Sequence, residues 1–183
     1  MAEYADDAAM MADMARGNAD AFDRLMDRYG NSVYAFAWRL CGDKAAADDV
    51  AQDALLKIWL NAGKWRPSAK LTTWLYQITR HCYVDRCRRI KPTVSDDALA
   101  EMPSDEKSPE DVLIQKDDSE RVAKAIDALP DSQKEALILC YYQGLTSGEA
   151  AECLGTSRTA VESLLFRARQ TLKEKLVADK GGK

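Results

Sequence analysis

The chain has 183 residues, of which 46% are hydrophobic and 31% are charged, and its formal net charge is −4. This balance is typical of one or two globular domains and excludes a fibrous or largely disordered chain. The longest run without a charged residue, Ala136 to Gly148, is too short for a membrane-spanning helix, which needs about 20 residues. The acidic N-terminus has no secretory signal, so we expect a cytoplasmic protein.

Few residues are suited to catalysis or metal binding. His81 is the single histidine, and no phosphate-binding glycine motif is present. The cysteines form no C-x-x-C pair, and their odd number is typical of reduced thiols; they are Cys41, Cys82, Cys87, Cys140 and Cys153. On one helix, His81, Cys82 and Cys87 would point in different directions. We therefore expect no metal, no cofactor and no enzymatic activity.

Charge is distributed in blocks along the chain. Residues 64–91 hold eight Lys and Arg against one acidic residue, whereas residues 92–120 hold ten acidic residues against two basic ones. The basic block is interleaved with the aromatic residues Trp65, Trp74, Tyr76 and Tyr83. Cations hold phosphates and rings stack on bases, so this block is suited to nucleic acid. From composition alone, a solvated basic helix face is an equally good interpretation.

Apolar residues at helical spacing predict helices through the first 90 residues, and no strand. The predicted helices cover about Ala5–Arg16, Asn18–Gly30, Asn31–Gly42, Asp43–Leu60 and Thr72–Arg89. Asn18, Asn31 and Asp43 are suited to cap the helices that they begin. Residues 61–70 are expected to form a loop, because they contain glycine and proline. In the last of these helices, Trp74 and Cys82 fall on the apolar face and are expected in the core.

The second half of the chain differs in composition from the first. Residues 91–120 carry three prolines and many acids, which predicts a flexible linker with a helical end at most. Further helices are predicted at Val122–Leu129, at Ser132–Tyr142 and, with an interruption near Gly155, at Thr146–Leu176.

The last pair of helices has the pattern of a helix-turn-helix. Thr146 and Glu149 form a T-x-x-E capping box, Gly155 ends the first helix, and Ser157 can cap the second. In such a unit the second helix enters the DNA major groove. A plain helical hairpin remains the alternative, and Phe166 is suited equally to a thymine methyl group and to inward packing.

Two stretches resemble the extracytoplasmic-function (ECF) sigma factors. Residues 20–91 resemble their promoter-melting domain through LMDRYGNSVYAFAWRLCGDKAAADDVAQDALLKIW, W-x-P and LTTWLYQITRHCYVDRCRR. Residues 121–176 resemble their C-terminal promoter-binding domain through AIDALPDSQKEALILCYYQGLTSGEAAECLGTSRTAVESLLFRARQTL. The resemblance implies an all-α protein of two small helical domains, residues 1–91 and 121–178, with an acidic linker at 92–120 and a tail at 179–183.

The resemblance also implies a function. An alternative sigma factor binds the clamp region of core RNA polymerase, recognises specific promoters and helps to open the DNA. Such factors are often held inactive by an anti-sigma factor, and this one is expected to be a monomer when free. The alternative is a stand-alone helix-turn-helix regulator, but this leaves residues 44–91 without a role and normally needs a dimer.

Site residues follow from the resemblance. Polymerase binding is assigned to the outward face of the fourth helix, at Asp48, Asp49, Gln52, Asp53, Leu56 and Lys57. The minus-ten element is assigned to Trp65, Lys70, Tyr76, Gln77, Arg80, His81, Tyr83, Val84, Arg86, Arg88, Arg89 and Lys91. The minus-thirty-five element is assigned to Arg158, Thr159, Glu162, Ser163, Phe166, Arg167 and Arg169. His81 stands where the family commonly has asparagine and Glu162 where many members have arginine, so we expect unusual base preferences at both elements.

Overall fold

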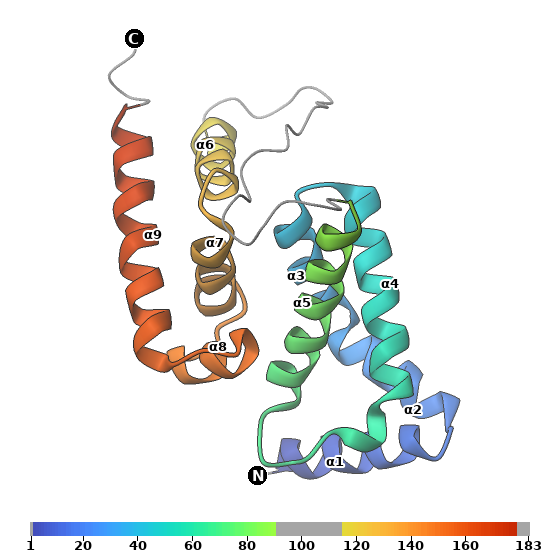
Figure 1. Ribbon diagram of the computed structural model, residues 1–183. Helices are drawn as coiled ribbons and strands as arrows, with labels where there is room; N and C mark the ends of the chain where they lie inside the picture. The colour runs from blue at the N-terminus through green and yellow to red at the C-terminus, as the bar shows by residue number, and fades with distance from the viewer. Residues whose placement is uncertain (1, 91–114, 179–183) are drawn as a thin grey trace.

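The computed structural model describes residues 2–90 and 115–178, with side chains from 5 to 90 and from 121 to 177. All regular structure in these ranges is helical (Figure 1). The N-terminal half contains α1 (Ala2–Ala15), α2 (Ala19–Leu25), the π-turn η1 (Met26–Gly30), α3 (Asn31–Cys41), α4 (Lys44–Leu60), the 3-10 turn η2 (Ala62–Lys64) and α5 (Leu71–Ile90). The C-terminal half contains α6 (Gln115–Asp127), α7 (Asp131–Leu137), the π-turn η3 (Ile138–Tyr142), α8 (Ser147–Leu154) and α9 (Arg158–Ala178).

Local signals set most boundaries in the N-terminal half. The Asn18 side chain accepts a hydrogen bond from the Asp20 N–H at 3.0 Å, and Asp43 accepts from the Ala46 N–H at 2.8 Å. Both satisfy an N–H group that has no partner within its helix. Gly42 has φ +68° and ends α3 in the left-handed conformation that glycine adopts without steric cost. These caps confirm the predicted starts of α2 and α4.

The prediction that Gly30 ends a helix and Asn31 caps the next was wrong. Gly30 is right-handed helical, with φ −55°, and η1 runs directly into α3. The apolar face continues through this point, because Leu25, Tyr29 and Val33 are all buried. Burial on one continuous face stabilises the helical path more than the local preference of glycine opposes it.

The helix-turn-helix pattern is confirmed in α8 and α9. The Thr146 Oγ1 accepts from the Glu149 N–H at 3.3 Å, and the Glu149 carboxylate accepts from the Thr146 N–H at 2.8 Å. Gly155 is left-handed, and the Ser157 Oγ accepts from the Ala160 N–H at 3.1 Å. The turn is therefore short and capped on both sides, which fixes the angle at which α9 leaves α8.

The helical end that was allowed for the predicted linker is present. Helix α6 begins at Gln115, seven residues before the predicted start at Val122. The remainder of the predicted linker, and the predicted tail, lie outside the described residues.

The first core fills the N-terminal half. Its buried members include Leu25, Val50, Ile58 and Leu75, which face one another from α2, α4 and α5. Helix α1 closes one end of this bundle with three buried methionines (Figure 1).

A buried polar network also ties α1 to η1. The Asp7 carboxylate accepts from the Tyr29 hydroxyl at 2.8 Å and from the Arg28 guanidinium at 2.9 Å. Burial and the Asp7 carboxylate raise the pKa of Tyr29 to about 12.

The second core joins the two halves of the chain. Ile138, Leu139, Val161 and other buried residues of the C-terminal half form one apolar cluster with Phe36, Leu40 and Tyr76. The Phe36 and Tyr76 rings lie 5.1 Å apart, and α5 lies against α8 (Figure 1). The helices after the linker are therefore packed on α3 and α5.

In the described ranges, no helix has the length and apolar character needed to cross a membrane. No disulfide joins the cysteines, and Cys82 is buried, as predicted for a core residue.

Candidate nucleic-acid interface

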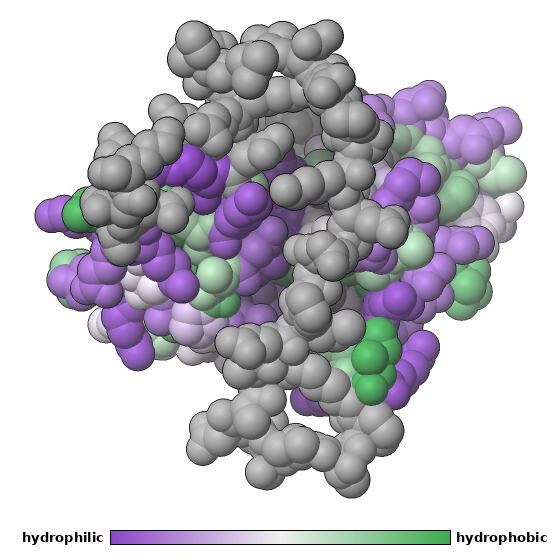
Figure 2. All heavy atoms as spheres, turned by 90° about the horizontal axis from the view of Figure 1, so that it is seen from above, coloured by the Kyte–Doolittle hydropathy of each residue, from purple (hydrophilic) through white to green (hydrophobic). Residues whose placement is uncertain are grey.

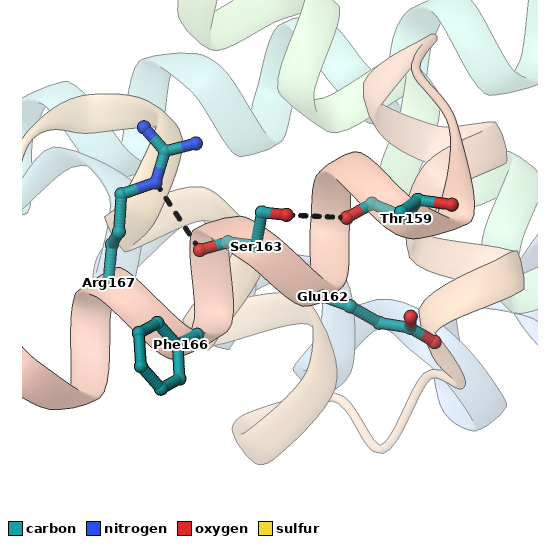
Figure 3. A pocket seen from close by; sticks show the side chains of 5 residues that line it. All are labelled: Thr159, Glu162, Ser163, Phe166 and Arg167. Atoms are coloured by element: carbon teal, nitrogen blue, oxygen red, sulfur yellow. Dashed lines mark hydrogen bonds between the residues drawn. The ribbon is translucent and has the colours of Figure 1, made fainter.

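The exposed face of α9 carries a shallow depression of about 520 Å³ (Figure 3). All of its lining residues were predicted to meet the minus-thirty-five element: Thr159, Glu162, Ser163, Phe166 and Arg167. Phe166 is 60% exposed, which excludes the alternative of inward packing and leaves contact with a thymine methyl group as a prediction. The face presents a carboxylate, a guanidinium, hydroxyls and one aromatic ring, which are the groups that read base edges and thymine methyl groups.

Hydrogen bonds within α9 hold several of these groups. The Arg158 Nε donates to the Glu162 Oε1 at 2.8 Å, and the Ser163 hydroxyl donates to the Thr159 carbonyl at 2.9 Å. The Arg167 Nε donates to the Ser163 carbonyl at 3.4 Å (Figure 3). Glu162 thus neutralises Arg158, a cation that was predicted to contact DNA.

A second depression, of about 710 Å³, lies where α4 ends beside α5. Its lining residues are Lys57, Asn61, Lys64, Trp74, Gln77, Ile78, Arg80, His81, Val84, Asp85 and Arg88. Five of the predicted minus-ten residues are brought together here: Gln77, Arg80, His81, Val84 and Arg88. Sequence reasoning missed Asn61, Lys64 and Asp85 and placed Trp74 in the core, although Trp74 is only partly buried.

Lys57 faces this depression. Its Nζ lies 3.2 Å from the Asp85 Oδ2 on α5. Burial alone would lower the pKa of Lys57, but Cys82 and Asp85 raise it above its ordinary value. Lys57 thus reaches across to α5 and lines the same depression as His81, while its assignment to polymerase binding stays a prediction.

Two predicted minus-ten residues are buried and not exposed as expected. Trp65 is 6% exposed and belongs to the first core, because the chain turns inward after η2. Tyr76 is 4% exposed and belongs to the second core. Tyr76 does lie off the apolar stripe of α5, but the C-terminal half covers that side of the helix.

Three cations of the predicted minus-ten set are paired with carboxylates. The Arg86 Nη1 lies 2.7 Å from the Asp49 Oδ2, the Arg80 Nε lies 2.8 Å from the Glu135 Oε2, and the Lys70 Nζ lies 2.7 Å from the Glu149 Oε1. The other members of the set divide by exposure. Arg88 and Arg89 are exposed, Tyr83 is partly buried, and Lys91 lies outside the described residues.

The outward face of α4 carries a row of exposed acidic and apolar residues. Asp48, Asp49, Gln52, Asp53 and Leu56 are all exposed, as expected. Leu60 is 69% exposed and extends this row, although the sequence prediction did not include it. The spacing 49, 53, 56, 60 would have identified it, since residues three and four apart share a helix face.

Hydrophilic side chains cover most of both described halves in the view from above, with apolar ones scattered among them (Figure 2). On α9, the exposed Phe166 lines the depression together with the exposed polar residues Glu162 and Arg167.

Family models match both halves of the chain. The family model for sigma-70 region 2 matches residues 25–93, and that for sigma-70, region 4 matches residues 119–172. The chain is 31% identical to the ECF RNA polymerase sigma factor SigM of Bacillus subtilis (strain 168), over 82% of this chain and 92% of SigM.

Two solved structures are similar over both halves. The first is CnrH in complex with the cytosolic domain of CnrY, with a TM-score of 0.71, 27% identity and coverage of 95% of this chain and 99% of CnrH. The second is the sigma factor RpoE in complex with the anti-sigma factor NepR from Bartonella quintana, with a TM-score of 0.65, 26% identity and coverage of 86% and 98%.

These matches define a protein with the two promoter-binding regions of the sigma-70 class. The chain belongs to the ECF RNA polymerase sigma factors, which act in transcription initiation.

Proposed function

We propose that this ECF sigma factor uses three separate surfaces: α4 for core polymerase, α5 with the end of α4 for the minus-ten element, and α9 for the minus-thirty-five element. The observation that carries the proposal is the face of α9, the second helix of a capped helix-turn-helix. Every residue that lines the depression on this face is exposed. The proposed domains are residues 1–91 and 121–178. The factor acts in the cytoplasm and has no catalytic site of its own.

The α9 surface enters the major groove at the minus-thirty-five element. A carboxylate accepts hydrogen bonds from cytosine, so Glu162 favours a cytosine where an arginine would favour a guanine. Phe166 contacts a thymine methyl group, while Arg167 and Arg169 hold phosphates.

The depression between α4 and α5 takes the minus-ten element. Extruding a base from the DNA stack costs a few kcal/mol, which new contacts must offset. His81 and Gln77 offer donors and acceptors at the wall of the depression, and the missed residue Asn61 adds an amide. Trp74 offers a ring on which a base can stack.

The α4 row docks on the polymerase clamp. Three exposed carboxylates precede the exposed Leu56 and Leu60 along α4, which suits a partner surface with a basic part and an apolar part. Charge complementarity of this kind speeds and orients association.

An anti-sigma factor holds the chain inactive in this proposal. The support is that CnrH and RpoE, which are similar to this chain over both halves, were solved with CnrY and with the anti-sigma factor NepR respectively. A pull-down from the native cells should recover an inhibitor in stoichiometric amount. Recovery of polymerase subunits alone would contradict this part.

Reconstituted transcription tests the function directly. The purified chain is mixed with sigma-free core polymerase on templates with randomised promoter regions, and we expect discrete start sites that depend on the chain. His81→Asn should change only the selected minus-ten sequence, and Glu162→Arg only the minus-thirty-five sequence, so that each variant is the control for the other. Tight DNA binding by the chain alone, with no stimulation of the core, would favour the stand-alone regulator.

A further inference from the structure

Helix α1 lies against the segment that connects α4 to α5, and η2 runs beside it (Figure 1). The part of the chain that matches the family model for region 2 begins only after α1. The first core nevertheless includes buried residues of α1 and of the connecting segment: Met10, Met11, Met14, Ala62 and Trp65. One apolar cluster therefore joins α1 to the turn beside the depression between α4 and α5.

The end of α1 meets η2 at two small residues. A methyl group added to Gly63, the middle residue of η2, would lie 3.5 Å from the Cβ of Ala15, which is an ordinary van der Waals contact. Ala15 is the last residue of α1. A β-branched side chain at Gly63 carries two more methyl groups on its Cβ, so it would press on Ala15 and move η2 away from α1.

Residues on both sides of Gly63 line the depression between α4 and α5. Asn61 directly precedes η2, and Lys64 is its last residue. The Lys64 N–H donates to the Asn61 carbonyl at 2.8 Å, so the turn links the two residues. A displacement of η2 therefore moves polar groups at the wall of the depression where the minus-ten element is proposed to bind.

Polar contacts hold α1 in place independently of η2. The Asp7 carboxylate is 5% exposed and accepts from the Arg28 guanidinium at 2.9 Å and from the Tyr29 hydroxyl at 2.8 Å. Nearer the other end of α1, the Asp13 carboxylate accepts from the Arg24 guanidinium at 3.3 Å. Helix α1 is thus fixed to α2 and η1 at two points and forms a support on which η2 rests.

We propose that α1 positions the residues that select the minus-ten element. Through the contact of Ala15 with Gly63, α1 sets the place of η2 and with it the places of Asn61 and Lys64. Ala15 and Gly63 are positioning residues, because they act through η2 and not through a contact with DNA. The inference rests on the proposed function of the depression, because the place of η2 affects selection only if the depression meets the minus-ten element.

Selection from randomised minus-ten sequences tests the positioning role, in transcription reconstituted with the full chain and sigma-free core polymerase. Gly63→Val should lower the discrimination between minus-ten sequences about tenfold, as expected for the loss of one base contact. Gly63→Ala should select as the wild type does, because a methyl group fits against Ala15. Selection at the minus-thirty-five element and the Kd for core polymerase should stay unchanged in both variants.

A second substitution on α1 shows whether the effect of the valine passes through this contact. Ala15→Gly removes the methyl group on which the valine presses, so the double variant should regain most of the lost discrimination. Ala9→Gly is the matched control, because Ala9 is an exposed alanine that lies about 120° around the same helix from Ala15. A valine that disturbed DNA directly, or that only destabilised the fold, would not be rescued from Ala15 alone.

Thermal melting checks that each variant is folded. If Gly63→Val does not fold, Ala15→Leu enlarges the same contact from the side of α1 and should give the same loss of discrimination. Wild-type selection by the enlarged variants, or equal rescue by Ala9→Gly and Ala15→Gly, overturns the positioning role.

The proposed function of the depression is tested separately by His81→Asn. If this variant changes minus-ten selection while the enlarged variants do not, the positioning role fails and the proposed function stands. If His81→Asn leaves minus-ten selection unchanged, the proposed function of the depression fails.

Discussion

Arg86 on α5 donates to Asp49 on α4 with an Nη1–Oδ2 distance of 2.7 Å. The pair joins a cation proposed for promoter DNA to a carboxylate proposed for polymerase. The Asp49 side chain is 63% exposed. Ion pairs with this degree of exposure contribute about 0–1 kcal/mol to the free energy of unfolding.

Asp49→Asn is therefore expected to lower the free energy of unfolding by less than about 1 kcal/mol, because solvent screens the lost attraction. The affinity of this variant for core polymerase should fall, since the α4 row loses a charge. Urea unfolding and a polymerase-binding titration measure the two effects. A large loss of stability with unchanged polymerase binding would show that Asp49 serves the fold instead.

Leu60, the exposed residue at the end of α4, gives a sharper test of the α4 row. Leu60→Ser should weaken polymerase binding by about tenfold, because burying one large apolar side chain contributes about 1.5–3 kcal/mol. Thermal stability should stay unchanged, since Leu60 is already exposed. Val177→Ser is the matched control: Val177 is also exposed but lies at the end of α9, far along the chain from the row. Equal losses in both variants would contradict the assignment.

Glu162→Gln should release Arg158, which Glu162 holds at 2.8 Å. The full chain should then bind a short non-specific duplex more tightly, and the plot of log K against log salt should steepen by about 0.9 for one phosphate gained. Selection at the corresponding base should also relax. Glu174→Gln is the control, because Glu174 is an exposed acid on the same helix beyond the depression. A slope unchanged from the wild type would argue against release of a phosphate-binding cation.

The buried hydroxyl of Tyr29 predicts an alkaline limit to stability. Burial and Asp7 raise its pKa from 10 to about 12 in the folded protein. The hydroxyl thus contributes stability that is fully present below pH 10 and is lost as the pH rises toward 12. The free energy of unfolding, measured by urea titration at successive pH values, should fall across this window. In Tyr29→Phe the free energy of unfolding should fall less over the same pH range. A pH profile identical to that of the wild type would assign the effect to another group.

Helical periodicity and capping residues predicted most of the fold. Asn18, Asp43 and Thr146 cap helices because their side chains satisfy backbone groups within a few residues, which is information that a sequence contains. The helix end predicted at Gly30 was wrong because distant segments bury the residues on either side of it. The local preference of glycine gives no information about such segments.

In the candidate site, too, features of a single helix were predicted and features that depend on several segments were not. The α9 face was predicted in full, because one helix supplies all of its residues. Tyr76 and Trp65 were expected to be exposed, but contacts with the C-terminal half and with the first core cover them. Lys57 and Asp85 meet across two helices, and this pairing could not be read from either helix alone.

The π-turn at Met26–Gly30 has a consequence for chain length. Such a turn holds one residue more than regular α-helix over the same rise, so it behaves as a single-residue insertion. A residue deleted from a uniform α-helix turns everything after it by about 100°. Deleting one residue within the π-turn instead restores regular helix through nearly the same rotation, so Phe36 and Leu40 should still face the C-terminal half. The segment can therefore lose one residue without changing which side of α3 the rest of the protein meets.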